Sequence, residues 1–329
     1  MRGWLASLLL AWLLLGGGLV TPAMSAAPPS VAEMARPEKP ARPGDSLIEA
    51  ARFVRGREVS PVAFMLAVSV LGLLVQAVRV WGGRALPLVR GVTTLLIFLF
   101  LWELTVFLGL VTTILLPAPT VVLQRLDALW LNGYLQWHLV STLRRFLLSF
   151  GLAVAPAFPL GVLVANFPRA FGLLDPVMTF VRMIPSPAWA PLAILWLGLG
   201  DPPAIFIVWL AIFFPIFLNT IRGIHDTLPI YREVIRTLGG SRWDEIVNAT
   251  VPCALPVIFT GVRVGFGFGW VVLAAAELIA VDSGLGWLIQ AAYTQVDSPA
   301  VLAAMTLICW LGILLDAGLR QLERRLISW

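Results

Sequence analysis

Cysteine and histidine are nearly missing from this chain, which has two of each in 329 residues. Cys253 and Cys309 lie in or beside apolar runs without metal-binding or redox spacing, so they fit the role of small hydrophobic residues. Two histidines are too few for a histidine-based metal or catalytic cluster. The apolar runs also hold no serine–histidine pair, paired aspartates or metal-ligand spacing, which argues against an intramembrane hydrolase. We therefore expect no catalytic residue, no metal and no cofactor.

Charged side chains are also scarce, because they make up 12% of the residues against about 25% in soluble domains. Hydrophobic residues make up 59%, more than a soluble protein of this length could cover. The sequence therefore predicts an all-α protein, a polytopic transmembrane helical bundle. The net charge of +5 does not indicate nucleic-acid binding, because the arginines fall in loops, where the positive-inside rule accounts for them.

The N-terminal part differs from the rest of the chain. Residues 1–27 predict a signal-like segment or an N-terminal anchor, since a short basic start precedes an apolar core and a small-residue cleavage site. Residues 28–60 are polar and proline-rich, which is typical of a linker. Residues 61–81 form an extra candidate transmembrane helix. No function follows from this extension.

Six further apolar runs make up a domain at residues 91–329. Loops that carry arginine alternate with loops poor in basic residues, which predicts that both ends of this domain lie inside the cell. The expected spans are residues 93–115, 139–166, 176–200, 204–221, 255–281 and 299–319.

Residues 231–246 form the longest polar interval after Thr93, and spans flank this interval on both sides. A helical run over 231–238 stops at Gly239-Gly240, and Ser241 stands where an N-cap would open a second short helix. Two short helices around a glycine corner at the membrane surface would suit docking of a partner. An ordinary cytoplasmic loop is the alternative.

Several residues within the spans are candidates for a pathway or gate. Glu103 should face protein or water, either as a gate group or as a structural hydrogen-bond acceptor. Prolines break the span at 176–200, which is typical of translocation sites, although a simple kink or a late helix start is also possible. The candidates are Glu103, Arg182, Pro185, Pro187, Arg263 and Glu277.

Three glycines repeat at four-residue spacing in the span at 255–281. This spacing leaves one helix face without side chains and predicts close packing against another helix. It does not match a phosphate-binding loop. The residues are Gly261, Gly265 and Gly269.

The polar interval resembles the EAA loop of permease subunits of bacterial ABC importers. Glu233, Gly239 and the final Pro252 keep the spacing of that motif, while Val234 and Ile235 replace its two alanines. In that family the loop inserts into a groove on the ATPase subunit. The resemblance implies a coupling loop at 222–256, in which Glu233 holds the loop against a basic group of the loop or of the ATPase. The implied coupling residues are Glu233, Arg236, Gly239, Ser241, Arg242, Trp243 and Pro252.

Further segments resemble the nitrate/sulfonate/taurine branch of these permeases, among them Arg182-Met183-Ile184-Pro185 and Ala276-Glu277 followed by Gly284-Leu285-Gly286. The resemblance implies a type I importer core of six helices plus the N-terminal extension. It also implies the partners: a second, usually identical permease subunit, two cytoplasmic ABC ATPase subunits, and a periplasmic or lipid-anchored binding protein. The resemblance also implies that the protein is located in the bacterial inner membrane, where it contacts the lipid bilayer.

The substrate stays open at this point. Nitrate, taurine, alkanesulfonates and a small heterocycle such as a pyrimidine vitamin precursor are candidates, and an anion would fit the arginines if they face the pathway. The chain has no phosphate-binding loop and so does not itself hydrolyse ATP. An ATP-independent carrier or channel, and a membrane scaffold or sensor, are the alternative functions.

Overall fold

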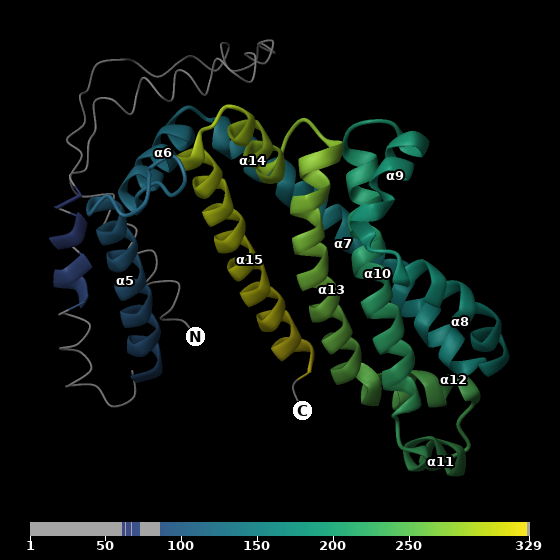
Figure 1. Ribbon diagram of the computed structural model, residues 1–329. Coiled ribbons are helices and arrows are strands. Elements are labelled where there is room, and N and C mark those ends of the chain that lie inside the picture. The colour runs from purple at the N-terminus through teal and green to yellow at the C-terminus, as the bar shows by residue number, and fades with distance from the viewer. Residues whose placement is uncertain (1–60, 63, 67, 73–85, 328–329) are drawn as a thin grey trace, which may run out of the picture. The chain divides into compact units, whose positions relative to one another are not determined.

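The structure is a computed structural model that describes residues 61–62, 64–66, 68–72 and 86–327. The segments predicted at 1–27 and 28–60 lie outside the described residues, and the extra span predicted at 61–81 is described only in part. Within the described residues every regular element is a helix (Figure 1). The all-α class is therefore confirmed.

Four described helices are long and apolar enough to cross a membrane. A fifth crossing can come from a pair of helices that meet at a bend of 89°, and a shorter apolar helix covers Gly91–Phe107. Together they match the six segments expected after residue 91. The long helices are α7 (Tyr134–Asn166), α10 (Asp201–His225), α13 (Val251–Ala280) and α15 (Ser298–Leu326). The bent pair comprises α8 (Pro168–Met183) and α9 (Ala190–Leu197). The shorter segment belongs to α5 (Leu86–Phe107).

Three boundaries differ from the sequence prediction. The span expected at 93–115 ends at Phe107, where turns follow. The span expected at 139–166 begins earlier, at Tyr134, directly after Gly133, whose left-handed conformation with φ of +72° separates α7 from α6 (Pro119–Leu131). The loop expected after the span at 255–281 contains a helix, α14 (Leu285–Thr294), whose ten residues are too few to signal a span.

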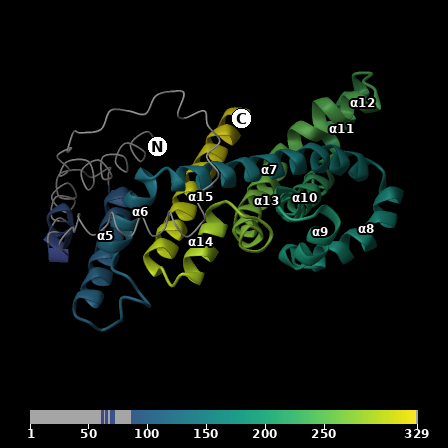
Figure 2. The ribbon, with the colours of Figure 1, turned by 90° about the horizontal axis from the view of Figure 1, so that it is seen from above.

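Helix α10 packs closely against α13 at its side and against α7, which crosses both helices (Figures 1 and 2). The face of α13 that meets α10 carries the predicted glycines Gly261, Gly265 and Gly269, all buried. A Cβ on Gly265 would lie 2.9 Å from the carbonyl oxygen of Ile212 on α10. The absence of side chains at these positions therefore lets the two backbones approach each other.

Replacing Gly265 by alanine should destabilise the protein, because the new methyl group meets backbone that cannot move without separating α10 from α13. We expect a loss of about 1–3 kcal/mol in the free energy of unfolding. Gly267→Ala is the matched control, since a Cβ there has no atom within 4 Å. Thermal unfolding of the purified chain in lipid nanodiscs measures both variants. Equal melting temperatures for the two would contradict the close-packing interpretation.

Candidate functional site

The glycine corner in the polar interval has the geometry of a Schellman motif. Helix α11 (Pro229–Thr237) ends at Leu238, and Gly239 follows with φ of +79°. The Gly240 N–H donates to the Ile235 carbonyl and the Gly239 N–H donates to the Arg236 carbonyl, both at 2.9 Å. A residue with a side chain at position 239 would be strained, so the predicted corner is confirmed and needs glycine.

Ser241 opens the second helix, α12 (Arg242–Glu245), through a capping box. The Asp244 N–H donates to Ser241 Oγ at 3.3 Å, and the Ser241 N–H donates to the Asp244 carboxylate at 2.8 Å. The predicted N-cap is therefore confirmed. A π-helical segment, η2 (Ile246–Thr250), then joins α12 to α13, and no sequence signal predicted it.

A bidentate ion pair connects the two short helices across the corner. Arg236 donates through Nε to Glu245 Oε1 at 2.6 Å and through Nη2 to Oε2 at 3.0 Å. The hydrogen bond to Glu245 raises the pKa of the Arg236 guanidinium, so the pair stays ionised. The resemblance implied that Glu233 would hold the loop against a basic group. Within the loop the hydrogen bonds to Arg236 come from Glu245, while Glu233 is exposed and acts on Arg236 through its charge alone.

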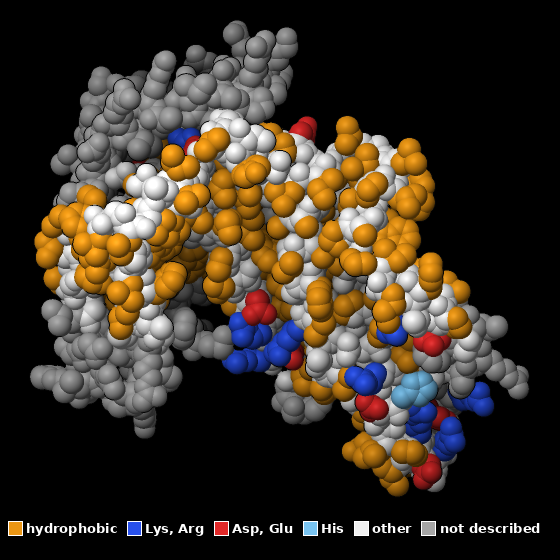
Figure 3. Space-filling model, in the orientation of Figure 1, with side chains coloured by type: hydrophobic (Ala, Val, Ile, Leu, Met, Phe, Trp, Pro, Cys, Tyr) orange, Lys and Arg blue, Asp and Glu red, His pale blue; other side chains and the backbone are white. Residues whose placement is uncertain are grey.

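The outer surface of this corner is apolar and unpacked. Helix α11 has no buried residue, and in Figure 3 hydrophobic and basic side chains cover the tip formed by α11 and α12. Leu238 is 79% exposed and Trp243 is 69% exposed. An apolar patch of this kind, rimmed by charges, marks an interaction site. The exposed large side chains are Leu228, Ile230, Tyr231, Val234, Leu238 and Trp243, and Arg236 and Arg242 are exposed beside them.

The predicted break in the fifth crossing lies between Met183 and Ser186. Pro185 lies within the break, and Pro187 lies in the short 3₁₀-helix (Ser186–Trp189) that leads into α9. Arg182, in the last turn of α8, is exposed. The break follows from the missing backbone donors of these prolines.

Three other candidates occupy defined positions. Glu103 is 1% exposed and accepts hydrogen bonds from Thr120 N–H at 3.2 Å and Thr120 Oγ1 at 2.9 Å, which supports its structural alternative as a cap of α6. Arg263 pairs with Glu323 of α15. Pro252 lies in the first turn of α13, directly after the π-helical segment η2, within the continuous helix Arg242–Ala280.

The largest polar assembly was not predicted as a site. Arg145 of α7, 1% exposed, pairs through Nη1 with Glu277 of α13 at 2.8 Å and through Nε with Asp201 of α10 at 2.6 Å. Its Nη1 and Nη2 also donate to the carbonyl and hydroxyl oxygens of Ser283, at 2.6 and 2.5 Å. Of the residues in this assembly, the sequence analysis named only Glu277, as a candidate for the pathway or gate. We call Arg145, Asp201, Glu277 and Ser283 the buried ion cluster.

The Glu277 carboxylate in this cluster also organises the turn that leads into α14. It accepts from Thr142 Oγ1 at 2.9 and 3.0 Å and from the Gly286 N–H at 2.9 Å. A Cβ on Gly284 would lie 2.3 Å from Glu277 Oε1, and Gly284 has φ of +112°. The two glycines after Glu277 in the sequence therefore let the backbone close around this carboxylate. Glu277 lies within the protein core and holds the turn in place.

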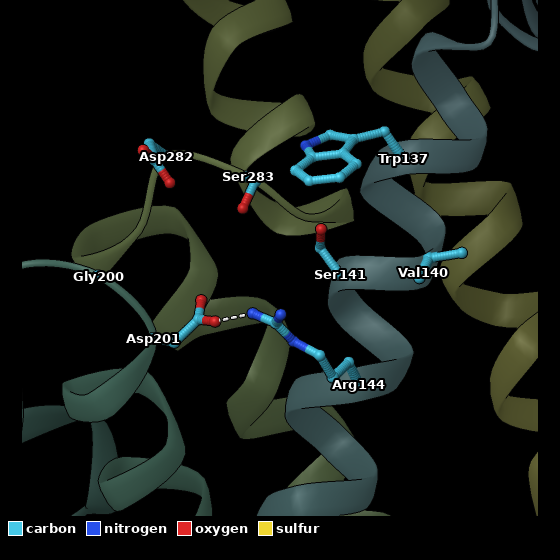
Figure 4. A pocket seen from close by; sticks show the side chains of 8 residues that line it. All are labelled: Trp137, Val140, Ser141, Arg144, Gly200, Asp201, Asp282 and Ser283. Atoms are coloured by element: carbon cyan, nitrogen blue, oxygen red, sulfur yellow. Dashed lines mark hydrogen bonds and ion pairs between the residues drawn. The ribbon is translucent and has the colours of Figure 1, made fainter. Parts of the chain in front are cut away.

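A pocket of about 330 Å³ adjoins the buried ion cluster (Figure 4). One face of α7 supplies four of its residues, the start of α10 and the residue before it supply two, and the turn before α14 supplies two. We call it the Trp137 pocket. Its lining residues are Trp137, Val140, Ser141, Arg144, Gly200, Asp201, Asp282 and Ser283.

The neighbouring arginines Arg144 and Arg145 provide a matched test of the buried ion cluster. Arg145→Gln should lower the free energy of unfolding by about 3–5 kcal/mol, because it leaves the buried Glu277 charge without its cation. Arg144→Gln should cost less than about 1 kcal/mol, because this side chain is 61% exposed. Thermal unfolding in nanodiscs measures both. The double variant Arg145→Gln/Glu277→Gln should regain part of the loss, and equal losses for the two single variants would contradict the prediction.

Comparison with known proteins adds independent information. The family model of the binding-protein-dependent transport system inner membrane component matches residues 157–328. The taurine transport system permease protein TauC of Escherichia coli is 35% identical over 252 residues, which cover 74% of this chain and 92% of TauC. The putative aliphatic sulfonates transport permease protein SsuC of Bacillus subtilis is 32% identical and covers 77% of this chain and 92% of SsuC. The nitrate import permease protein NrtB of Synechocystis is 32% identical, over 63% of this chain and 79% of NrtB.

The matched region contains the bent pair, the glycine-packed helices, the polar corner and the buried Glu277. The match spans more than half of the chain, and the first relative is aligned over nearly its whole length. The match therefore favours an ABC permease over the alternatives of an ATP-independent carrier or channel and of a membrane scaffold. In such transporters the partner ATPase subunits hydrolyse ATP. This chain belongs to the binding-protein-dependent transport system inner membrane components, as a multi-pass, non-catalytic permease subunit of an ABC importer in the nitrate/sulfonate/taurine branch.

Proposed function

We propose that the corner formed by α11 and α12 docks on a cytoplasmic ABC ATPase and transmits its movement to the membrane helices. The observation that carries the proposal is an exposed apolar patch on a corner that is fixed internally. Leu238 and Trp243 are exposed although the surrounding backbone is capped at both short helices. A partner surface would bury these side chains, and Glu233 and Arg242 would meet charges on it.

The internal fixation matters for coupling. The Schellman motif, the capping box around Ser241 and the Arg236–Glu245 pair leave the corner few ways to deform. A push on α11 then passes through α12 and η2 into α13 instead of being absorbed by a loose loop. Closure of the ATPase subunits on ATP would in this way move the membrane helices and switch the access of the pathway.

We propose further that two copies of the chain line one pathway for a small solute, with the break at Pro185 and Pro187 beside it. A periplasmic or lipid-anchored binding protein would deliver the solute to the opposite face. The solute class is a small anion or acid, because the named relatives transport taurine, aliphatic sulfonates and nitrate. The pyrimidine precursor has no support among these relatives.

The docking surface can be tested by co-purification with the candidate ATPase encoded nearest to this chain. Leu238→Ala should weaken the complex about tenfold, because truncating a central apolar contact costs 1–2 kcal/mol or more. Gly239→Arg should abolish it, since the residue needs a left-handed backbone and the new side chain would stand on the docking face.

Leu199→Ala is the matched control, because Leu199 is 78% exposed, as Leu238 is, but lies beyond α9, away from the corner. The control should retain wild-type affinity, and all variants should reach the membrane. Loss of the complex only in the corner variants supports coupling through this surface. Unchanged complex and unchanged ATP-dependent uptake in both corner variants would overturn it.

A further inference from the structure

The Trp137 pocket has two chemically different ends. In Figure 4, Trp137 and Asp282 face each other across one end with Ser283 between them, the Arg144–Asp201 pair lies at the other end, and Ser141 lies between Trp137 and Arg144. The loops that contribute Gly200 and Asp282 are both expected on the outer face of the membrane, because they are poor in basic residues. The pocket thus opens at the face where solute enters.

Ser141 points to a ligand. The residue is only 8% exposed and lines the pocket, yet no hydrogen bond is recorded for its hydroxyl within the described part of the chain. Ser149, on the same helix, does donate to the carbonyl of Arg145 one turn earlier, at 2.8 Å. The hydroxyl oxygen is accessible from the pocket, where a ligand oxygen would give it a hydrogen-bond partner.

The end near Trp137 suits a cation. The Trp137 side chain is exposed by 66%, so its ring face is open. Asp282 is exposed, and no ion pair or hydrogen bond of its side chain is recorded among the described residues. An open indole face and an uncompensated carboxylate are the two groups that recognise an ammonium group.

The other end suits an acid group. Arg144 donates from one Nη to Asp201, and a guanidinium has five N–H donors, so donors remain for a ligand on this 61% exposed side chain. The buried neighbour Arg145 is already satisfied by Asp201, Glu277 and Ser283. Arg144 is therefore the arginine of the pair that can bind an oxyanion.

We propose that the Trp137 pocket is an entry site for a small zwitterion, with its ammonium group between Trp137 and Asp282 and its sulfonate or carboxylate group on Arg144 and Ser141. The inference rests on the proposed function for its assignment to the transported solute, and it narrows the solute class from small anions to amino acids of the sulfonate or carboxylate type. A simple inorganic anion would leave Asp282 uncompensated beside it, and a simple amine would leave Ser141 and Arg144 without an acceptor.

Ligand binding to the purified permease in nanodiscs tests this without any partner. Isothermal titration compares four probes: taurine, ethanesulfonate, ethylamine and nitrate. Taurine should bind about tenfold more tightly than ethanesulfonate, which is the combined size of an exposed ion pair and a cation–π contact. Asp282→Asn should weaken taurine and should not weaken ethanesulfonate, so that the advantage of taurine is lost. Ser141→Ala should weaken both sulfonates.

Asp226→Asn is the matched control, because Asp226 is an exposed aspartate at the far end of α10 from the pocket. It should leave all four affinities unchanged. Equal binding of taurine and ethanesulfonate would overturn the inference, as would tight binding of ethylamine alone, which would assign the pocket to a cationic side chain of a partner protein. Absence of taurine binding would also overturn it.

Failure of the proposed zwitterion site can be distinguished from failure of the proposed coupling to the ATPase. An ATPase complex that forms while taurine fails to bind would leave the proposed function standing and remove the zwitterion site. Taurine binding that depends on Asp282, in a chain that forms no ATPase complex, would do the reverse.

Discussion

The arrangement of the membrane helices depends on one buried cation. Arg145 lies in the low-dielectric interior, where an uncompensated charge would cost several kcal/mol, so its carboxylate partners must stay within hydrogen-bonding distance. Asp201 and Glu277 come from α10 and α13, and Ser283 comes from the turn before α14. One guanidinium on α7 therefore holds the start of α10, the last turn of α13 and the entry to the shorter helix α14.

Different forces hold the same helices at other depths. In the middle of the bundle, the absence of side chains at the glycines of α13 lets its backbone approach α10. There the two helices are held by dispersion contacts and not by ion pairs. At the opposite end from Arg145, hydrogen-bonded caps and the Arg236–Glu245 pair fix the α11–α12 corner. A movement imposed on the corner therefore meets stiff connections along the whole of α13, which runs from η2 to the loop at Asp282.

Local signals account for what the sequence predicted well. The proline break near Pro185, the left-handed Gly239 and the cap at Ser241 are each decided within a few residues, and apolar runs locate most of the spans. The ion cluster is different, because Arg145 and Glu277 are 132 residues apart and only the fold brings them together. Glu103 shows where prediction from the local sequence stops. The sequence was compatible with a gate group and with a structural hydrogen-bond acceptor, and the buried contact with Thr120 favours the structural role.

A substrate bound in the Trp137 pocket would affect the relative position of α7 and the loop that follows α13. Arg144 belongs to α7, whereas Asp282 belongs to the loop that continues from α13, so a ligand held by both would tie these two elements together. Such a ligand binds better when α7 and this loop are close, and it must by linkage stabilise that arrangement to the same extent. Because the other end of α13 continues into the corner that we propose for the ATPase, occupancy of the pocket and the state of the ATPase would act on the same helix. The two ends of the transporter would then communicate through α13 without a separate device.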